Sequence, residues 1–180
     1  MDEKGVDRMR LLKTIINIID NINTWIGKTV RYSVLLLMSV VVYEVISRRF
    51  FNAPTIWAFE TILIVYGFHL MMVSGYGLLK DSIVSIDILS GKFSEKTRHI
   101  MLLITYMIFF FPFIILTIPE SIDFAMKSWE IKESSWSVWA PPVYPIKTVI
   151  PIALILLLLQ GISQYLKSVV FLFEGKNSNQ

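Results

Sequence analysis

Apolar residues are gathered into four long blocks that short polar segments separate. The blocks predict membrane-spanning helices at about 28–50, 56–80, 99–119 and 146–170. Each block is about as long as a bilayer core requires. Long blocks favour helices over the short alternation of a barrel. The pattern therefore predicts an all-α integral membrane protein, with its transmembrane domain at 28–172 and a polar, disordered tail at 173–180.

A different pattern precedes the first block, at residues 7–24. Apolar residues recur there at helical spacing: Met9, Leu12, Ile15, Ile16, Ile19, Ile22 and Ile26. Polar residues occupy the other faces: Arg10, Lys13, Asn17, Asp20 and Asn21. This pattern predicts an amphipathic helix lying on the membrane surface within an N-terminal segment, 1–27. It would serve as an interfacial anchor or as a docking helix for a partner. It lacks the features of a signal peptide.

A polar and aromatic hairpin, residues 48–60, separates the first two blocks. Asn52 and Pro54 break the helix, and Thr55 can cap the next one. Glu44 lies four residues before Arg48, so the two can pair along one helix face. We also expect an ion pair between Arg48 and Glu60 across the hairpin. Glu44 is either a functional acid at membrane depth or one half of an orienting ion pair.

The second block carries a stripe of polar and small residues at seven-residue spacing, namely Glu60, Gly67 and Ser74. Small residues on a stripe let another helix approach closely. His69 lies at mid-depth on the face opposite Glu60, so the two cannot form one polar path along this helix. We expect a neutral His69 bonded to a neighbouring helix; the alternative is a role in a proton relay.

Prolines shape the second half of the chain. Pro112 is expected to kink the third helix and Pro119 to mark its end. The following loop, 120–147, carries Trp129, Trp136 and Trp139, an aromatic belt at one interface. It is either an interfacial anchor or a docking surface. The last helix opens at Lys147, with Pro151 in its first turns, and ends in a polar edge of Gln160, Ser163, Gln164 and Lys167.

The distribution of Lys and Arg predicts the orientation. Four spans put both termini on one side, together with the loop 80–99, for which we expect a short amphipathic surface piece. That side holds 12 of the basic residues and the other side holds 5. By the positive-inside rule the termini are cytoplasmic.

Composition limits the chemistry. Hydrophobic residues make up 54% of the 180 residues, and there is no cysteine, which excludes thiol chemistry. Only two histidines are present, at different depths, so a pair of axial haem ligands is not expected. A phosphate-binding glycine loop is also missing. We therefore expect no enzyme, cofactor, metal or nucleic-acid partner. The open alternatives are an accessory transporter subunit, a stand-alone four-helix carrier or channel, and a membrane anchor of a quinone-linked oxidoreductase.

Two motifs resemble those of a known family. The string Arg48-x-x-Phe51-Asn52-x-Pro54-x-x-Trp57-x-x-Glu60 is similar to the signature of the small, four-helix membrane subunit of tripartite ATP-independent periplasmic (TRAP) transporters. The entry to the last helix agrees: Trp139-Ala140-Pro141-Pro142-x-Tyr144-Pro145-x-Lys147-x-x-Ile150-Pro151. Gly75, Gly77 and Asp87 also match, and the resemblance covers about 8–172. One departure is Ile83, where many members have His.

The resemblance implies a function and partners. The small subunit enlarges the fixed scaffold for a large membrane subunit that carries the substrate and sodium sites and moves as an elevator. A periplasmic solute-binding protein delivers an organic acid, and the complex lies in the bacterial inner membrane. The hairpin motif would then be structural, and Gly67 and Ser74 would contact the large subunit. The residues that would meet the binding protein are Trp136, Trp139, Pro141, Pro142 and Tyr144.

Overall fold

The computed structural model describes the backbone of residues 3–80 and 94–177. The N-terminal helix α1, Glu3–Val30, is followed after a short turn by α2, Ser33–Phe50. The hairpin leads into α3, Ala58–Leu79. The predicted surface piece in the loop 80–99, with Ile83 and Asp87, lies mainly outside the described residues.

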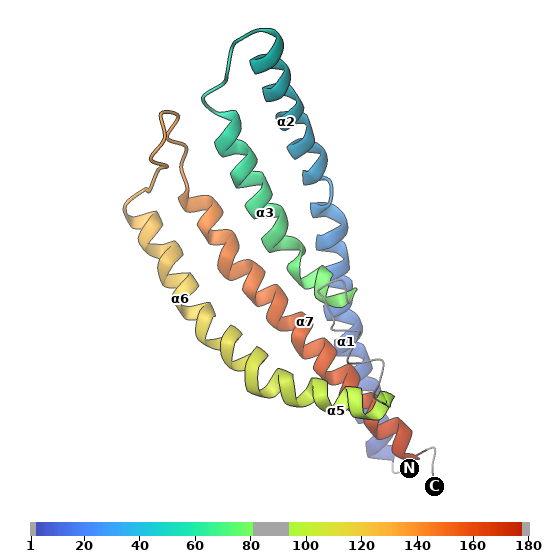
Figure 1. Cartoon of the computed structure of the whole chain (residues 1–180). Helices are drawn as coiled ribbons and strands as arrows, with labels where there is room; N and C mark the ends of the chain where they lie inside the picture. The colour runs from blue at the N-terminus through green and yellow to red at the C-terminus, as the bar shows by residue number, and fades with distance from the viewer. Residues whose placement is uncertain (1–2, 81–93, 178–180) are drawn as a thin grey trace.

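The third apolar block forms one bent helical path (Figure 1). It comprises α5, Glu95–Thr105, a π-helical turn η1, Tyr106–Phe110, and α6, Phe111–Glu130. In the π turn the Phe111 N–H donates to the carbonyl of Tyr106, five residues earlier. Such a turn accommodates Pro112, which lacks an N–H and whose ring crowds the preceding turn. The predicted distortion at Pro112 is confirmed.

The predicted helix end at Pro119 is wrong. Pro119 lies inside α6, which continues to Glu130. A helix that ended at membrane depth would leave several backbone groups without hydrogen bonds where no water can bind them. A continuous helix that lacks only the hydrogen bond of Pro119 costs less free energy than such an end. The loop that follows is correspondingly shorter than 120–147. The last helix, α7, also runs beyond the predicted limits, from Tyr144 to Asn177, so that residues 173–177 of the predicted tail are helical.

The spanning helices form an open layer rather than a closed bundle. α7 contacts α6 on one side and α3 on the other, and α2 contacts α3 (Figure 1). α1 packs against α3 and α7. Within residues 3–80 and 94–177, four helices are long and apolar enough to cross a membrane, in agreement with the predicted fold class. Whether α1 lies along the membrane surface stays a prediction.

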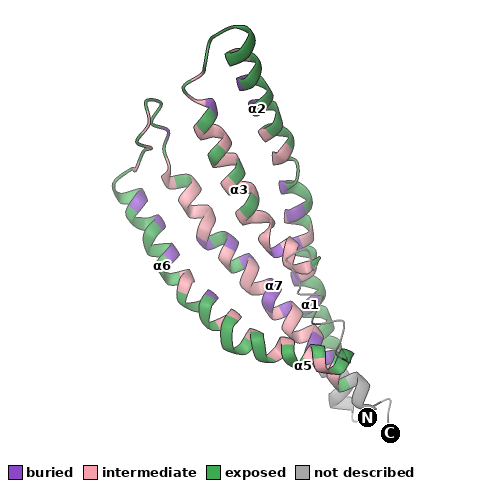
Figure 2. Cartoon of the chain, in the orientation of Figure 1, coloured by how far each residue is buried: buried purple, intermediate pink, exposed green. Residues whose placement is uncertain are grey.

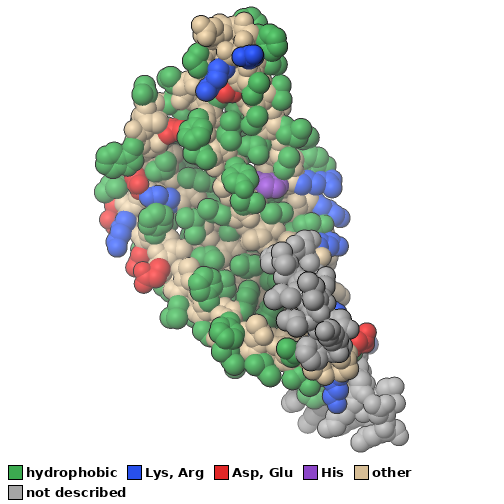
Figure 3. All heavy atoms as spheres, in the orientation of Figure 1, with side chains coloured by type: hydrophobic (Ala, Val, Ile, Leu, Met, Phe, Trp, Pro, Cys, Tyr) green, Lys and Arg blue, Asp and Glu red, His purple; other side chains and the backbone are tan. Residues whose placement is uncertain are grey.

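Little of this layer is buried within the chain. The most apolar window of the α7 span is 33% buried, whereas the corresponding windows of Met9–Phe50, of α3 and of Glu95–Glu130 are only 11%, 6% and 6% buried (Figure 2). The chain exposes 12717 Å², whereas a compact soluble protein of this mass would expose roughly 8,900 Å². Hydrophobic side chains cover most of the face drawn in Figure 3, and charged side chains gather towards its rim. Such a surface must meet lipid or another protein.

Candidate functional site

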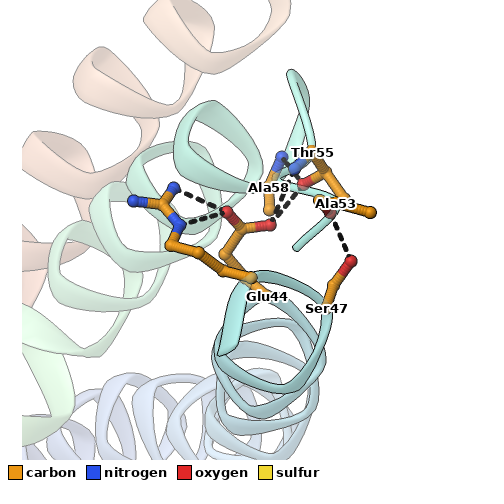
Figure 4. Close-up of polar contacts among 6 residues, drawn as sticks. Glu44, Ser47, Ala53, Thr55 and Ala58 are labelled. Carbon is orange, nitrogen blue, oxygen red and sulfur yellow. Dashed lines mark hydrogen bonds and ion pairs between the residues drawn. The ribbon is translucent and has the colours of Figure 1, made fainter. Parts of the chain in front are cut away.

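The hairpin between α2 and α3 is organised around Glu44 (Figure 4). Its Oε1 accepts hydrogen bonds from Arg48 Nη2 at 2.7 Å and Nε at 3.2 Å. Its Oε2 accepts from Thr55 Oγ1 at 2.5 Å and from the Thr55 N–H at 3.3 Å. The carboxylate side chain is 12% exposed, although Arg48 is largely in the open. The predicted pair of Glu44 and Arg48 is confirmed. The same carboxylate also anchors the returning chain through Thr55.

The same hairpin is held at two further points. Thr55 Oγ1 accepts from the N–H of Ala58, the first residue of α3, at 3.3 Å, although the N-cap residue itself is Trp57, whose side chain makes no cap bond. Ser47 Oγ donates to the Ala53 carbonyl at 2.5 Å, and the Ala53 N–H donates to the Ser47 carbonyl at 3.1 Å. Asn52 has a φ of 50°, a left-handed conformation that Asn tolerates well. The helix break at Asn52 therefore follows from the left-handed backbone of Asn52 and from the hydrogen bonds between Ser47 and Ala53.

The predicted ion pair between Arg48 and Glu60 is wrong. Arg48 binds Glu44, while Glu60 accepts a short hydrogen bond from Ser135 in the loop before α7. Glu44 is the closer partner because i,i+4 residues on one helix face each other. Glu60 lies in the first turn of α3, where the helix dipole favours a carboxylate. Among the described residues its buried Oε2 has no hydrogen-bond partner.

The other hairpin-motif residues lie at the same end of the molecule. The rings of Tyr43 and Trp57 stack with centroids 5.7 Å apart, which ties α2 to the start of α3. Phe51 is 73% exposed, and Pro54 is exposed. Glu44 of α2 and Trp57 of the motif thus hold the base of the hairpin, whose tip at Phe51 and Pro54 is apolar and exposed.

The loop 131–143 is a second structured element at this end. Ser134 and Pro142 form an isolated antiparallel bridge. The Ser135 N–H donates to the Pro141 carbonyl, and the Val143 N–H donates to the Glu133 carbonyl, both at 2.9 Å. Pro141 is buried beneath the loop. These bonds close the loop into a ridge that Ser135 ties to α3.

The ridge is anchored to α7 by charge and by aromatic rings. Lys147 Nζ binds Glu133 Oε2 at 2.5 Å. Lys147 and the hydrogen bonds around Glu133 hold the pKa of this carboxyl below its usual 4.5. Trp129 Nε1 donates to Thr148 Oγ1 at 2.8 Å, and its ring lies 4.4 Å from that of Tyr144.

Two tryptophans of the ridge face outward. Trp136 is fully exposed, and Trp139 is 40% exposed. Val138, between them, is 89% exposed. A rigid ridge with exposed aromatic rings has the composition of a protein-contact surface. Trp129 is 52% exposed as well, but it bonds to Thr148 and its ring contacts that of Tyr144.

Glycine positions divide into two classes. A Cβ at Gly75 would collide with Asn23, at Gly161 with Phe110 and at Gly27 with Tyr76. These glycines allow helices of this chain to approach one another. At Gly67 no described atom lies within 4 Å of the place a Cβ would take. The stripe predicted for partner packing is thus open in this chain at Gly67, and Ser74 Oγ is bonded within its own helix, to the Met71 carbonyl at 2.7 Å.

A polar cluster that the sequence pattern does not predict lies at the opposite end. Asp20, predicted on a polar face of the N-terminal helix, faces α7. Its Oδ1 accepts from Ser163 Oγ at 2.7 Å and from Gln160 Nε2 at 3.0 Å, and its Oδ2 pairs with Lys167 at 2.7 Å. The polar edge of α7 is therefore an internal contact. The i, i+3, i+7 spacing of Gln160, Ser163 and Lys167 places them on one face of α7, and this spacing was the feature of the sequence that could have indicated the contact.

Both histidines bond to neighbouring helices. Ser33 Oγ of α2 lies 2.9 Å from His69 Nδ1, which confirms the expected contact. His99 Nδ1 lies 3.0 Å from Ser168 Oγ, and its ring stacks on Phe171 of α7. Among the described residues no group of three or more His, Asp or Glu could hold a metal ion. The described geometry is that of contact surfaces.

Comparison with known families identifies a match over most of the chain. The family model for tripartite ATP-independent periplasmic transporters, DctQ component, matches residues 37–170. This range includes the hairpin, α3, the ridge and most of α7. No curated protein and no solved structure matches significantly.

Proposed function

Because the chain belongs to the DctQ family of TRAP transporter components, we propose that it is the small subunit that scaffolds a large membrane subunit. In this proposal the large subunit carries the substrate and sodium sites and moves as an elevator. A periplasmic binding protein delivers an organic acid to the pair. The chain itself would transport nothing and would stay fixed in the bacterial inner membrane, with both termini cytoplasmic.

The open layer of helices is the observation that carries the scaffold role. A chain that conducted solute alone would need polar groups along an enclosed path, and the helices here form one layer around α7. Leu63 and Leu70, which share the face of Gly67 on α3, are large, apolar and exposed. Within a membrane, helix association depends on close packing and small residues. The open Gly67 on α3 supplies a place where a partner helix could approach closely.

The ridge and the hairpin support a role in contact with the binding protein. Both lie at the end of the layer opposite the chain termini (Figure 1). With the termini cytoplasmic, as the positive-inside rule favours, this end faces the periplasm. We therefore assign Trp136 and Trp139, with Pro141, Pro142 and Tyr144 as the supporting frame, to binding-protein docking.

Copurification tests the scaffold proposal. The tagged full chain is expressed with the proteins encoded beside it, extracted in mild detergent and analysed by mass spectrometry. We expect a large multi-helix membrane protein in about equal amount. Gly67→Leu should lose most of this partner, whereas Ser39→Leu, which adds similar bulk at an exposed position of α2, should retain it.

A monodisperse chain without a partner would contradict the proposal. The purified protein would then be tested for transport in liposomes and for a haem absorbance band. Full retention of the partner by Gly67→Leu would remove the α3 stripe from the interface and leave the family assignment intact.

A further inference from the structure

Glu60 carries a carboxylate oxygen to which the described part of the chain offers no partner. Its Oε1 accepts the hydrogen bond from Ser135, while its buried Oε2 accepts none from the described residues. Arg48 and Lys147, two basic residues at this end of the layer, are each paired with another carboxylate. A buried carboxylate oxygen without a donor or a counter-charge is costly, so its presence in a native fold requires an explanation.

A small pocket lies beside this carboxylate, between α3 and the ridge. It has a volume of about 130 Å³ and is lined by Glu60, Leu63 and Ile64 of α3 and by Ser135, Pro141 and Val143 of the ridge. Of these residues only Glu60 is charged, and all the others except Ser135 are apolar. A water molecule takes up about 30 Å³ in the liquid, so the pocket has room for the end of one side chain.

The pocket continues into the face of α3 that carries Gly67. Glu60 and Gly67 are seven residues apart, which places them on one stripe about 10 Å apart along the helix axis. Leu63, between them, lines the pocket and is 52% exposed. At Gly67 no described atom lies within 4 Å of the place a Cβ would take. A partner helix that packs on Gly67 therefore extends past Leu63 to the pocket.

The chemistry of the pocket favours a basic side chain. Glu60 lies in the first turn of α3, where the helix dipole favours negative charge. Charged residues in membrane-spanning segments pair with one another. An arginine or a lysine would supply both the counter-charge and the N–H donors that Oε2 lacks. The terminal torsion of a glutamate is broad, so the carboxylate can turn Oε2 towards a group in the pocket.

We propose that Glu60 binds an arginine or lysine side chain of the membrane helix that packs along the Gly67 face of α3. That helix belongs to the large membrane subunit, so this inference rests on the proposed scaffold function and names the chemistry of its interface. The exposed apolar side chains of this face, Leu63 and Leu70, do not by themselves define one position of the partner along α3. A charge pair at Glu60 would fix this register.

Copurification of the tagged full chain with the proteins encoded beside it, in mild detergent, tests the inference. Glu60→Gln keeps the shape of the side chain and an acceptor for Ser135 but removes the charge. We expect it to lower the retained large subunit by about tenfold, because a buried cation that loses its partner weakens binding strongly. Ser135→Ala removes the bond to the ridge and leaves the charge. Glu130→Gln makes the same change as Glu60→Gln at an exposed acid of α6. Both controls should retain the large subunit.

Photocross-linking identifies the occupant directly. Leu63 is replaced by benzoylphenylalanine in an otherwise wild-type chain, and the cross-linked peptide is sequenced by mass spectrometry. We expect attachment to a membrane helix of the large subunit, with an arginine or lysine within about one helical turn, or 5.4 Å, of the attachment site. This measurement decides the question if Glu60→Gln unfolds at a lower temperature than the wild type.

Full retention of the large subunit by Glu60→Gln would overturn the inference. Equal loss in Glu60→Gln and Ser135→Ala would also overturn it and would leave Glu60 as an anchor of the ridge. Attachment of position 63 to the binding protein, to lipid or to a helix without a nearby basic residue would exclude the assigned occupant. The scaffold proposal is judged separately, by whether the wild type retains a large subunit at all. If it retains none, both proposals fail.

Discussion

At the scale of single residues, Glu44 shows how one carboxylate can define a turn. It accepts hydrogen bonds from Arg48 on its own helix and from both the hydroxyl and the N–H of Thr55 on the returning chain. Hydrogen bonds to an ionised group are stronger than those between neutral groups. The side chain at membrane depth that invited a functional interpretation is thus an organiser of the hairpin.

Truncation of Glu44 should loosen the hairpin far more than truncation of Arg48. Glu44→Ala removes the acceptor of every one of these bonds, whereas Arg48→Ala leaves both Thr55 bonds in place. We expect protease cleavage within residues 51–56 to accelerate several-fold in Glu44→Ala and to change little in Arg48→Ala. Equal acceleration in the two variants would show that the ion pair, rather than the Thr55 anchor, holds the hairpin.

The ion pair of Glu133 and Lys147 predicts an acid transition of the ridge. The pKa of Glu133 is lowered in the folded chain from its usual 4.5 by the hydrogen bond and the charge of Lys147. Its ionised form therefore favours the folded ridge above pH 4.5. This stabilisation is lost as the pH falls through the lower, folded value.

Tryptophan fluorescence checks this transition, since Trp129, Trp136 and Trp139 lie in or beside the ridge. We expect a change in emission below pH 4.5 in the wild type. Glu133→Gln should lack this change, and Glu130→Gln, an exposed acid at the end of α6, should keep it. A transition that persists in Glu133→Gln would assign it to another carboxylate.

At the scale of helices, glycines mark two kinds of contact that look alike in sequence. Gly161 lets α7 approach the Phe110 ring in the π turn, and Gly75 lets α3 approach Asn23 of α1. Gly67 has open space at the place of its missing side chain. Gly161 and Gly75 are thus needed for contacts within the chain, whereas Gly67 is not.

Alanine substitutions should separate these roles. Gly161→Ala forces a methyl into the Phe110 ring and is expected to destabilise the chain by about 1–3 kcal/mol. Gly67→Ala should be neutral or stabilise by up to about 1 kcal/mol, because alanine is the better helix former. Thermal unfolding of the purified chain in detergent measures both. Destabilisation by Gly67→Ala would show that α3 packs on an element of this chain at that point.

Proline behaviour was only partly predictable. Pro112 and Pro119 have the same chemistry, and both were expected to disturb the helix. Pro112 follows a π turn, whereas Pro119 lies within a continuous α6. The difference depends on the surroundings of each proline, since a membrane penalises any break that exposes backbone groups.

At the scale of the whole molecule, the open layer separates one end from the other. Hairpin and ridge are joined by the bond between Ser135 and Glu60, so the exposed tryptophans stand on a frame fixed to α3 and α7. The opposite end is joined by Asp20 and its partners on α7. Polar contacts thus hold the helices together at both ends of the layer. The apolar side chains in the middle of the layer are mostly exposed and make few contacts within the chain.

The exposed rings of the ridge lead to a prediction for the assembled transporter. Trp136→Ala with Trp139→Ala should lower uptake several-fold at limiting binding protein while the membrane subunits still copurify. The reason is that exposed tryptophans contribute strongly to protein contacts but little to the stability of their own chain. Uptake into proteoliposomes with added binding protein is the measurement.

Trp25→Ala, a 70% exposed tryptophan of α1, is the control. Unchanged uptake in the double variant would exclude the ridge as the docking surface.

The sequence by itself determined the helices, the hairpin and the family. Block length, helix breakers and the i,i+4 pair of Glu44 and Arg48 are local features, and local sterics together with bilayer thickness fix their outcome. The tertiary structure alone decided that Glu60 binds Ser135, that Asp20 faces α7 and that the helices form an open layer. These outcomes depend on which helices become neighbours. Several residues far apart in the sequence could bond to the same polar group. The spacing of residues along one helix does not determine which of them does.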